Sequence, residues 1–351
     1  MRGATASRAT VAVLLVLTCQ AAAIADLSFP GFTDVSDLTL LGSAQAVDGV
    51  LRLTPGEQGM VGGVYARAKQ RVALGFETEF SFQLHDPVNE HGDGFTFIIQ
   101  NEAGTALDGT GWRLGYGGPG ISNSVAVEFD TYKNDGSLGG PSHDKHDPSD
   151  NHISVHTRGT LPNDADEIYS IAAIEAPSRM TDQQVHVARV TYTPGVLAVF
   201  LDDLETPCLL APLQLDTKLS LDAGAAWVGF TASTGASGVN QDILTWHFVC
   251  GPLPGDINGD GTVDGSDIQP FVDLLTGGGY QIEADINGDG VVDGLDIQPF
   301  VCIITCAECN AVPEPASLAL LAAGCVAVLR RRGRMPRGHQ GPTNPFLCNV
   351  G

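Results

Sequence analysis

The sequence contains little positive charge: 18 Lys and Arg stand against 41 Asp and Glu in 351 residues, for a formal net charge of −23. Nucleic-acid binding requires basic side chains that neutralise phosphates, so this composition argues against a nucleic-acid partner. Aromatic residues are also scarce, at 7%, whereas the 43 glycines indicate many tight turns. The acidic excess instead favours divalent cations, above all Ca²⁺, which proteins bind through oxygen ligands.

The first 25 residues have the layout of a cleavable secretion signal. Early arginines precede an apolar run, Val11–Leu17, and the small residues Ala23–Ala25 follow it. We therefore assign residues 1–25 to a signal peptide and expect an exported protein whose mature chain begins near Asp26.

Residues 26–250 show strand patterns separated by glycine, proline and aspartate turns. In Phe76–Leu84, apolar and polar residues alternate, as in a strand with one solvated side, and Pro194-Gly195 indicates a hairpin. Evenly spaced strands of this kind predict an all-β, two-sheet sandwich. Two cysteines of this region, Cys208 and Cys250, are candidates for a disulfide in an exported protein.

The stretch Val125–Asn134 predicts a buried strand with carboxylates on one face. Alternation places four polar residues together, namely Glu128, Asp130, Tyr132 and Asn134. Acids on so apolar a strand are costly to bury without a cation. Asp147 and His152 lie downstream and offer the oxygen and nitrogen donors of a mixed metal site.

This strand, followed by Asp147-Pro148 and His152, resembles the metal motif of the legume-type (L-type) lectins. Further blocks follow in the order of that family: Leu27–Phe32, Phe76–Leu84, Gly92–Phe95 and Val228–Gly235. The resemblance implies a concanavalin A-like jelly-roll sandwich over residues 26–250.

The resemblance also implies two adjacent ions. A transition metal such as Mn²⁺ is expected at Glu128, Asp130, Asp147 and His152. Ca²⁺ is expected at Asp130, Asp147, Asn134 and the Tyr132 carbonyl. The resemblance further implies that these ions hold in place the side chains that bind a glycan or polysaccharide.

In the resembled lectins an aspartate after a cis peptide accepts hydrogen bonds from sugar hydroxyls, and Asp93 after Gly92 occupies that position. The other expected carbohydrate-binding residues are Gly118 and Asn134, with Ser233, Thr234 and Gly235 as a variable rim. The insertion between Asn134 and Asp147 lacks a stacking aromatic. Trp112 or Tyr116 is a candidate to supply the stacking ring instead, and a buried core role is the alternative for either residue.

Two other functions fit parts of this pattern. Laminarinase-like glycoside hydrolases share the jelly roll and carry Glu-x-Asp-x-x-Glu, which Glu128 and Asp130 begin. Lys133 occupies the place of the second Glu, so the required carboxyl pair is absent and we expect no enzyme. A structural surface protein without sugar binding is the other alternative, against which Asp93 and Asn134 argue. We therefore expect an exported, calcium-dependent lectin.

After a linker at residues 251–255, residues 256–304 contain a 29-residue repeat of calcium-loop type. Oxygen donors stand at loop positions 1, 3, 5, 7, 9 and 12. They are Asp256, Asn258, Asp260, Thr262, Asp264 and Asp267 in the first loop, and Asp285, Asn287, Asp289, Val291, Asp293 and Asp296 in the second. The duplicated EF-hand-like loops, each followed by a helix, resemble a dockerin module, which implies a cohesin-like partner.

The repeat segment has ten acids and no Lys or Arg, so we expect Ca²⁺ to order it. Residues 305–311 form a second linker. Residues 312–334 contain Pro-Glu-Pro, the apolar run Ala316–Leu329 and a cluster of arginines. The run is shorter than the roughly 20 residues of a spanning helix. This order resembles a PEP-CTERM sorting signal, which implies an exosortase-type processing enzyme and leaves residues 335–351 as a tail without an assigned role.

Overall fold

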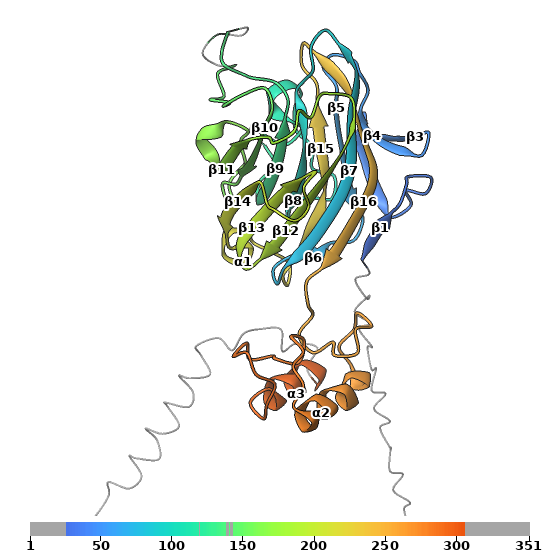
Figure 1. Cartoon of the computed structure of the whole chain (residues 1–351), viewed down its shortest axis with the longest axis vertical. Coiled ribbons are helices and arrows are strands. Elements are labelled where there is room, and N and C mark those ends of the chain that lie inside the picture. Colours follow the sequence, from blue (N-terminus) through green and yellow to red (C-terminus); the bar gives the residue numbers. More distant parts are fainter. Residues whose placement is uncertain (1–25, 119, 138–139, 141–142, 306–351) are drawn as a thin grey trace, which may run out of the picture. The chain divides into compact units, whose positions relative to one another are not determined.

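The computed structural model describes residues 26–305, apart from residues 119, 138–139 and 141–142 (Figure 1). The predicted signal peptide, the sorting signal and the tail lie outside the described residues. Within the described residues, no helix is both long enough and apolar enough to cross a membrane.

Two eight-stranded antiparallel sheets make up the first part of the protein (Figure 1). One sheet has the order β14-β13-β12-β7-β16-β4-β3, with β1 paired to β16. Its strands are β1 (Leu27–Phe29), β3 (Gln45–Val47), β4 (Val50–Thr54), β7 (Phe76–Val88), β12 (Val185–Thr193), β13 (Gly195–Leu201), β14 (Leu209–Leu213) and β16 (Gly238–Cys250). The predicted hairpin at Pro194-Gly195 is confirmed, because β12 and β13 pair across it.

The other sheet has the order β11-β10-β9-β8-β15-β5-β2, with β6 paired to β15. Its strands are β2 (Leu38–Gly42), β5 (Val61–Ala66), β6 (Gln70–Arg71), β8 (Gly94–Gln100), β9 (Ser124–Asp130), β10 (His152–His156), β11 (Ser170–Glu175) and β15 (Ala225–Ser233). Short helices lie in the connections: η1 (Gly111–Arg113), η3 (Glu167–Tyr169) and α1 (Leu215–Lys218). The predicted all-β sandwich is confirmed.

Aromatic rings from both sheets form the core between them. Phe80 and Phe82 of β7 alternate with partly exposed residues, and their rings meet those of the opposite sheet. The ring centroids of Phe80 and Phe129 lie 5.7 Å apart, and those of Phe82 and Phe95 lie 4.9 Å apart. Edge contacts of this kind add to the hydrophobic stabilisation. The side chain of Phe129 therefore fixes the inward face of β9, and the acids beside it must face outward.

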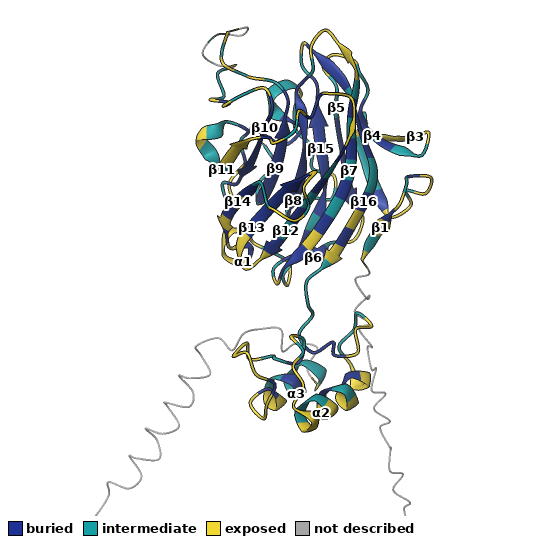
Figure 2. Cartoon of the chain, in the orientation of Figure 1, coloured by how far each residue is buried: buried dark blue, intermediate teal, exposed yellow. Residues whose placement is uncertain are grey.

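Loops cover the outward face of β8 and β9. A second apolar cluster lies there, in which Tyr65, Ile98, Tyr116 and Ala126 are buried. Every residue of β8, β9 and β10 is buried as a result, as the dark blue strands in Figure 2 show. The outward acids of β9 are thus enclosed on a face that in an ordinary antiparallel sheet would be solvated.

The candidate disulfide between Cys208 and Cys250 does not form, since both thiols are free. The Cys208 thiol lies 3.3 Å from the carbonyl of Val199, next to β14. Cys250 ends β16 and contacts Gln70. Three strands, β13, β12 and β7, separate β14 from β16 in the sheet, which places the two sulfurs far beyond bonding distance.

Residues 256–305 form a small helical part. It contains η4 (Gly265–Asp267), α2 (Ile268–Gly277) and α3 (Ile297–Thr305). The rings of Phe271 and Phe300, one from each helix, lie 4.2 Å apart and are both buried. The predicted loop-helix repeat therefore joins its two halves through a matched aromatic pair.

Candidate metal centre and binding site

Strand pairing brings the predicted ligands of two strands together. β9 and β10 are antiparallel, with His152 opposite Asp130 and Ser154 opposite Glu128. Side chains of directly opposed residues on one face lie within contact distance of each other. Glu128, Asp130 and His152 are all buried.

Asp130, Asp147 and His152 form one group of candidate metal ligands. Their ligand atoms all lie within 4.8 Å of one another. The backbone on either side is fixed, because the N–H of Tyr132 donates to Asp130 at 2.8 Å and the N–H of Asn134 donates to Asp147 at 2.6 Å. The two ligands predicted for both ions, Asp130 and Asp147, therefore converge with His152 of the transition-metal set, and the other two calcium ligands are held beside them.

The chemistry of this group fits bound cations. Burial and the neighbouring Asp147 hold the pKa of Asp130 well above its usual range, and burial raises the pKa of Asp147 to about 7. The side-chain oxygen of Asn134 is buried without a hydrogen-bond partner. Acids and an acceptor enclosed in this way are satisfied by a cation.

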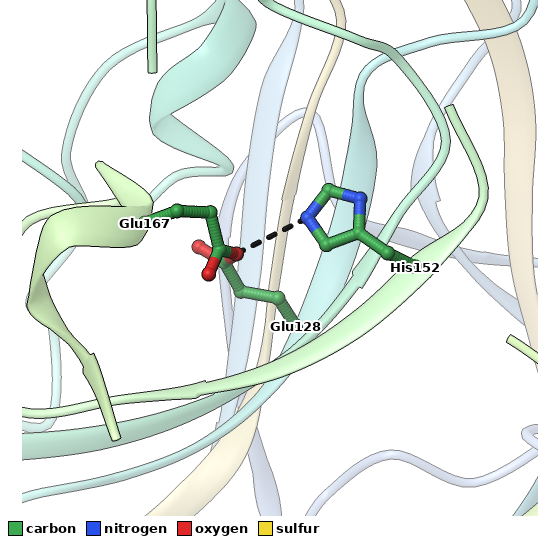
Figure 3. A group of neighbouring side chains, drawn as sticks. All are labelled: Glu128, His152 and Glu167. Atoms are coloured by element: carbon green, nitrogen blue, oxygen red, sulfur yellow. Dashed lines mark hydrogen bonds and ion pairs between the residues drawn. The ribbon is translucent and has the colours of Figure 1, made fainter. Parts of the chain in front are cut away.

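Glu128, His152 and Glu167 form a second group, whose functional groups turn toward one another (Figure 3). The hydroxyls of Tyr116 and Ser154 donate to the two oxygens of Glu128. The Nε2 atom of His152 lies 3.2 Å from Glu167 Oε1. The four ligands predicted for the transition metal are thus distributed over two groups that share His152.

Two members of this region were not among the predicted site residues. Glu167 stands in η3, and its side chain is 8% exposed. His156 Nε2 lies 3.2 Å from both Glu128 Oε2 and Glu167 Oε1. The alternation His152, Ser154, His156 along β10 is a sequence signal for the second histidine, whereas the position of Glu167 depends on the tertiary fold.

Asp93 lies at the edge of the same region, after a cis peptide bond from Gly92. It is 4% exposed, and one of its carboxylate oxygens is buried without a partner. Burial and the charge of Asp147 raise the pKa of Asp93 to about 7. The N–H and hydroxyl of Thr131 both donate to the carbonyl of Asp93. The end of β9 therefore links Asp93 to the metal ligands.

An aromatic ring that was not predicted lies next to Asp93. A Cβ atom on Gly92 would lie 3.2 Å from Cδ2 of Tyr132, so the ring packs against the Gly92 backbone. Tyr132 is half-buried and, with His91, Lys133 and Arg179, lines a pocket of about 610 Å³. Tyr132 was expected to contribute its carbonyl alone, and its ring is now the nearest candidate for a stacking surface.

Trp112 and Tyr116, the two other candidates for a stacking ring, have different surroundings. Tyr116 is fully buried and donates to Glu128, so its core role is the correct alternative. Trp112 is half-buried, and the Lys145 ammonium lies 3.7 Å from its ring centroid. A Cβ atom on Gly118 would lie 3.2 Å from the Trp112 ring, which places Trp112 beside that glycine.

Three of the expected carbohydrate-binding residues have polar groups engaged within the protein. The Ser233 hydroxyl donates to Gly111 and the Thr234 hydroxyl donates to Glu57, both at 2.6 Å, and both side chains are buried. The N–H of Gly118 donates to Asn163 at 3.3 Å. The hydroxyls of Ser233 and Thr234 are thus bonded inside the protein, each to a different neighbouring segment.

Two residues of this segment contact Asp93: the N–H of Asp93 donates to the Ser233 carbonyl at 3.1 Å, and the backbone of Gly235 lies against the Asp93 carboxylate. A Cβ atom on Gly235 would lie 2.8 Å from Asp93 Oδ2, closer than real Cβ contacts allow. The backbone N–H of Gly235 opposes the rise in the pKa of Asp93. Glycine is therefore required for the approach of this backbone to the carboxylate.

The legume lectin domain family matches residues 25–258. The chain belongs to this family. Agglutinin-2 of Cladrastis kentukea is 30% identical over 183 residues, 49% of this chain and 57% of the relative, so the match spans less than two thirds of that protein. Lectin 8 of Medicago truncatula is 27% identical over 267 residues, 67% of this chain and 90% of the relative.

Solved structures of this family have the same fold. Lectin I-B4 from Griffonia simplicifolia, in a metal-free form, is 24% identical, with a TM-score of 0.53 over 64% of this chain and 98% of that chain. Lectin II from Ulex europaeus is 23% identical, with a TM-score of 0.52 over 64% and 98%. These likenesses support the legume lectin fold of residues 26–250.

Two further families match later parts of the chain. The dockerin type I domain matches residues 254–299, and the PEP-CTERM protein-sorting motif matches residues 311–334. The predicted order of a legume lectin domain, a dockerin module and a PEP-CTERM motif is confirmed. The motif indicates export and C-terminal sorting.

The dockerin loops are closed by the carboxylates at their last positions. Asp267 accepts the N–H groups of Ile257 and Asn258 at 2.8 and 3.0 Å. Asp296 accepts those of Ile286 and Asn287 in the second loop, at 2.9 and 3.1 Å. The carboxylate at position 12 therefore ties the end of each loop to its beginning.

Proposed function

We propose that this protein is an exported carbohydrate-binding protein whose sugar site depends on Ca²⁺ and a transition metal, and that it is not an enzyme. The observation that carries the proposal is the pair of unpartnered buried oxygens on Asp93 and Asn134 beside the group Asp130, Asp147 and His152. Buried acceptors without partners mark a place where the protein contacts something else.

The residues present would hold two ions. Ca²⁺ would take Asp130, Asp147, the Asn134 side-chain oxygen and the Tyr132 carbonyl, and a transition metal such as Mn²⁺ would take Glu128, Asp130, Asp147 and His152. When bound, the ions neutralise the carboxylates and fix the ligands in place. Asn134 then presents its amide N–H groups outward, because its oxygen is occupied.

The chain's own residues supply the sugar contacts. The Asp93 carboxylate would accept hydrogen bonds from two neighbouring hydroxyls, and the amide of Asn134 would donate to one of them. The N–H of Gly235 lies beside the same carboxylate. The ring of Tyr132 offers an apolar surface against which a sugar face packs.

The experiment is a glycan array on the full chain, with Ca²⁺ and Mn²⁺ and again with chelator. We expect binding that chelator removes and that Asp93→Ala loses, while Asp93→Ala keeps its metals. The variant Asp37→Ala is a matched control, since Asp37 is exposed and does not have a positive φ. Binding of wild-type strength in chelator would contradict the metal-dependent site.

The hydrolase alternative has less support in the structure. Asp130 accepts the Tyr132 N–H and belongs to the candidate metal group, and Lys133, where a second acid would stand, is exposed. Assay of the full chain for release of reducing ends from β-glucans tests this alternative, and we expect no release.

We further propose the domain boundaries and partners. Residues 26–250 form the lectin domain, 256–304 the dockerin-like module and 312–334 the sorting signal, with linkers at 251–255 and 305–311. The dockerin match supports a cohesin-like partner, and the sorting motif supports an exosortase-type enzyme. Mass spectrometry of native extracellular protein that found peptides beyond Arg330 would contradict removal of the sorting signal.

A further inference from the structure

We propose that Glu167 is a further ligand of the transition metal, in addition to the four residues assigned above. This inference rests on the metal centre of the proposed function. Glu128, His152 and Glu167 offer ligand atoms within 4.8 Å of one another, which fits one shared ion (Figure 3). Carboxylate oxygen with imidazole nitrogen suits a divalent transition metal.

The hydrogen bonds of His152 point to a cation between its ring and Glu167. The Nδ1 atom lies 3.0 Å from the carbonyl of Ser149, which only accepts, so Nδ1 carries the proton. Nε2 then faces the acceptor Oε1 of Glu167 at 3.2 Å, and a cation between them, a proton in the metal-free chain or a metal ion in its place, satisfies both atoms. Metal-binding histidines show this arrangement, with the outer nitrogen bonded to a carbonyl and the inner one on the ion.

His156 holds the two glutamates without competing for the ion. Its Nδ1 lies 3.0 Å from the carbonyl of Asp164, which again makes that nitrogen a donor. Its Nε2 lies 3.2 Å from Glu128 and 3.2 Å from Glu167. A fully buried imidazole between two carboxylates orients both of them, and we assign His156 as a positioning residue.

Backbone bonds connect Glu167 to the loop that carries the calcium ligands. The N–H of Glu167 donates to Lys145 at 2.9 Å, and the N–H of Lys145 donates to Asn134 at 2.7 Å. Asp166 caps η3 by accepting the N–H of Ile168, and it contacts His146 at 2.9 Å. The longer loop between Asn134 and Asp147 therefore serves to position η3, and with it Glu167.

The first test counts the water molecules on Mn²⁺ in the unmodified full chain. Mn²⁺ favours octahedral coordination, so four protein ligands leave two water positions and a fifth ligand leaves one. The protein is loaded with Mn²⁺ in excess Ca²⁺, which occupies the dockerin loops. Electron–nuclear double resonance with ¹⁷O-labelled water then gives the number of coordinated waters. We expect one, and two would overturn the assignment.

The second test compares Glu167→Gln with Glu175→Gln, an exposed glutamate opposite His152 on β11. We expect Glu167→Gln to gain one coordinated water and to bind Mn²⁺ about 10–100-fold more weakly, while Glu175→Gln behaves as the wild type. Weaker binding with an unchanged water count would make Glu167 a positioning residue and overturn the proposal. Unchanged affinity and water count would do the same, whereas a wild-type protein without any transition metal would instead refute the metal centre itself.

Discussion

The two parts of this protein place acidic side chains in opposite settings. In the lectin domain, Asp130 and His152 stand on buried strands and Asp147 joins them from a loop. In the dockerin module, the ligands are contiguous in sequence and largely exposed, with Asp260 and Asp264 among the exposed ones. The candidate metal ligands of the sandwich lie beside a large aromatic core, whereas the module has few buried residues, so we expect the module to depend on bound Ca²⁺ for its order.

The largest expected effect of metal removal is therefore in the dockerin module. A fragment of residues 251–305 should lose most of its helical circular dichroism in chelator and regain it with Ca²⁺, because eight loop carboxylates repel one another without cations. Mg²⁺ should restore it poorly, since Mg²⁺ gives up its waters reluctantly. A helical signal that chelator leaves unchanged would show that the module folds without its ions, and the expected difference from the lectin domain would then be absent.

The lectin domain should lose function before it loses its fold. We expect Asp130→Asn to abolish binding of both ions and of sugar, at least 100-fold, because this carboxylate belongs to both proposed ligand sets. The near-ultraviolet dichroism of the aromatic core should persist. Metal analysis, calorimetry with glycan and circular dichroism on the same sample check this, with Asp37→Asn as the exposed control. Sugar binding of normal strength in Asp130→Asn would be incompatible with the proposed site.

These outcomes bear on what the sequence alone predicts. Alternation along residues 125–134 predicts which acids share a face, and strand pairing then places His152 correctly. The same local rule does not predict Glu167, which comes from a 3-10 turn brought in by tertiary contacts. It also does not predict that loops cover the outer face of β9. Ser233 and Thr234 were expected on a sugar-binding rim, whereas their hydroxyls lie inside the protein.

A smaller effect is the pH dependence of the metal-free lectin domain. The pKa of Asp93 and that of Asp147 are raised to about 7, and that of His156 is raised to about 10. The folded chain then keeps protons that the unfolded chain releases near pH 4 for Asp and near pH 6.5 for His. The free energy of unfolding should therefore fall as the pH rises from 5 to 7.5.

The measurement is thermal unfolding in chelator at both pH values, followed by addition of Ca²⁺ and Mn²⁺. We expect a lower Tm at pH 7.5 than at pH 5 without metals, and a larger gain on adding them at pH 7.5, because metal ligands bind as deprotonated groups. Carboxyls with lowered pKa, such as Asp202, stay ionised throughout this window. A Tm that rises with pH in chelator would show that these carboxylates are not held protonated.

The smallest expected effect concerns the contact between Gly235 and Asp93. In Gly235→Ala the new methyl group would meet a carboxylate oxygen at 2.8 Å, so one of the two must shift. We expect sugar binding to weaken about tenfold, which corresponds to about 1.4 kcal/mol, while both ions stay bound. Gly31→Ala is the control, because Gly31 does not have a positive φ and a Cβ there would come no closer than 3.5 Å to another residue.

The long strand β16 gives the lectin domain a mechanical property. It begins at Gly238, just after the segment that contacts Asp93, and ends at Cys250, where the chain leaves for the rest of the protein. Along most of this length β16 is hydrogen-bonded to β7, the other 13-residue strand (Figure 1). If the C-terminal side is held at a surface and a glycan pulls at the site, the load runs along the strand axis. Antiparallel hydrogen bonds lie perpendicular to that axis, so they are loaded in shear and must fail together rather than one at a time.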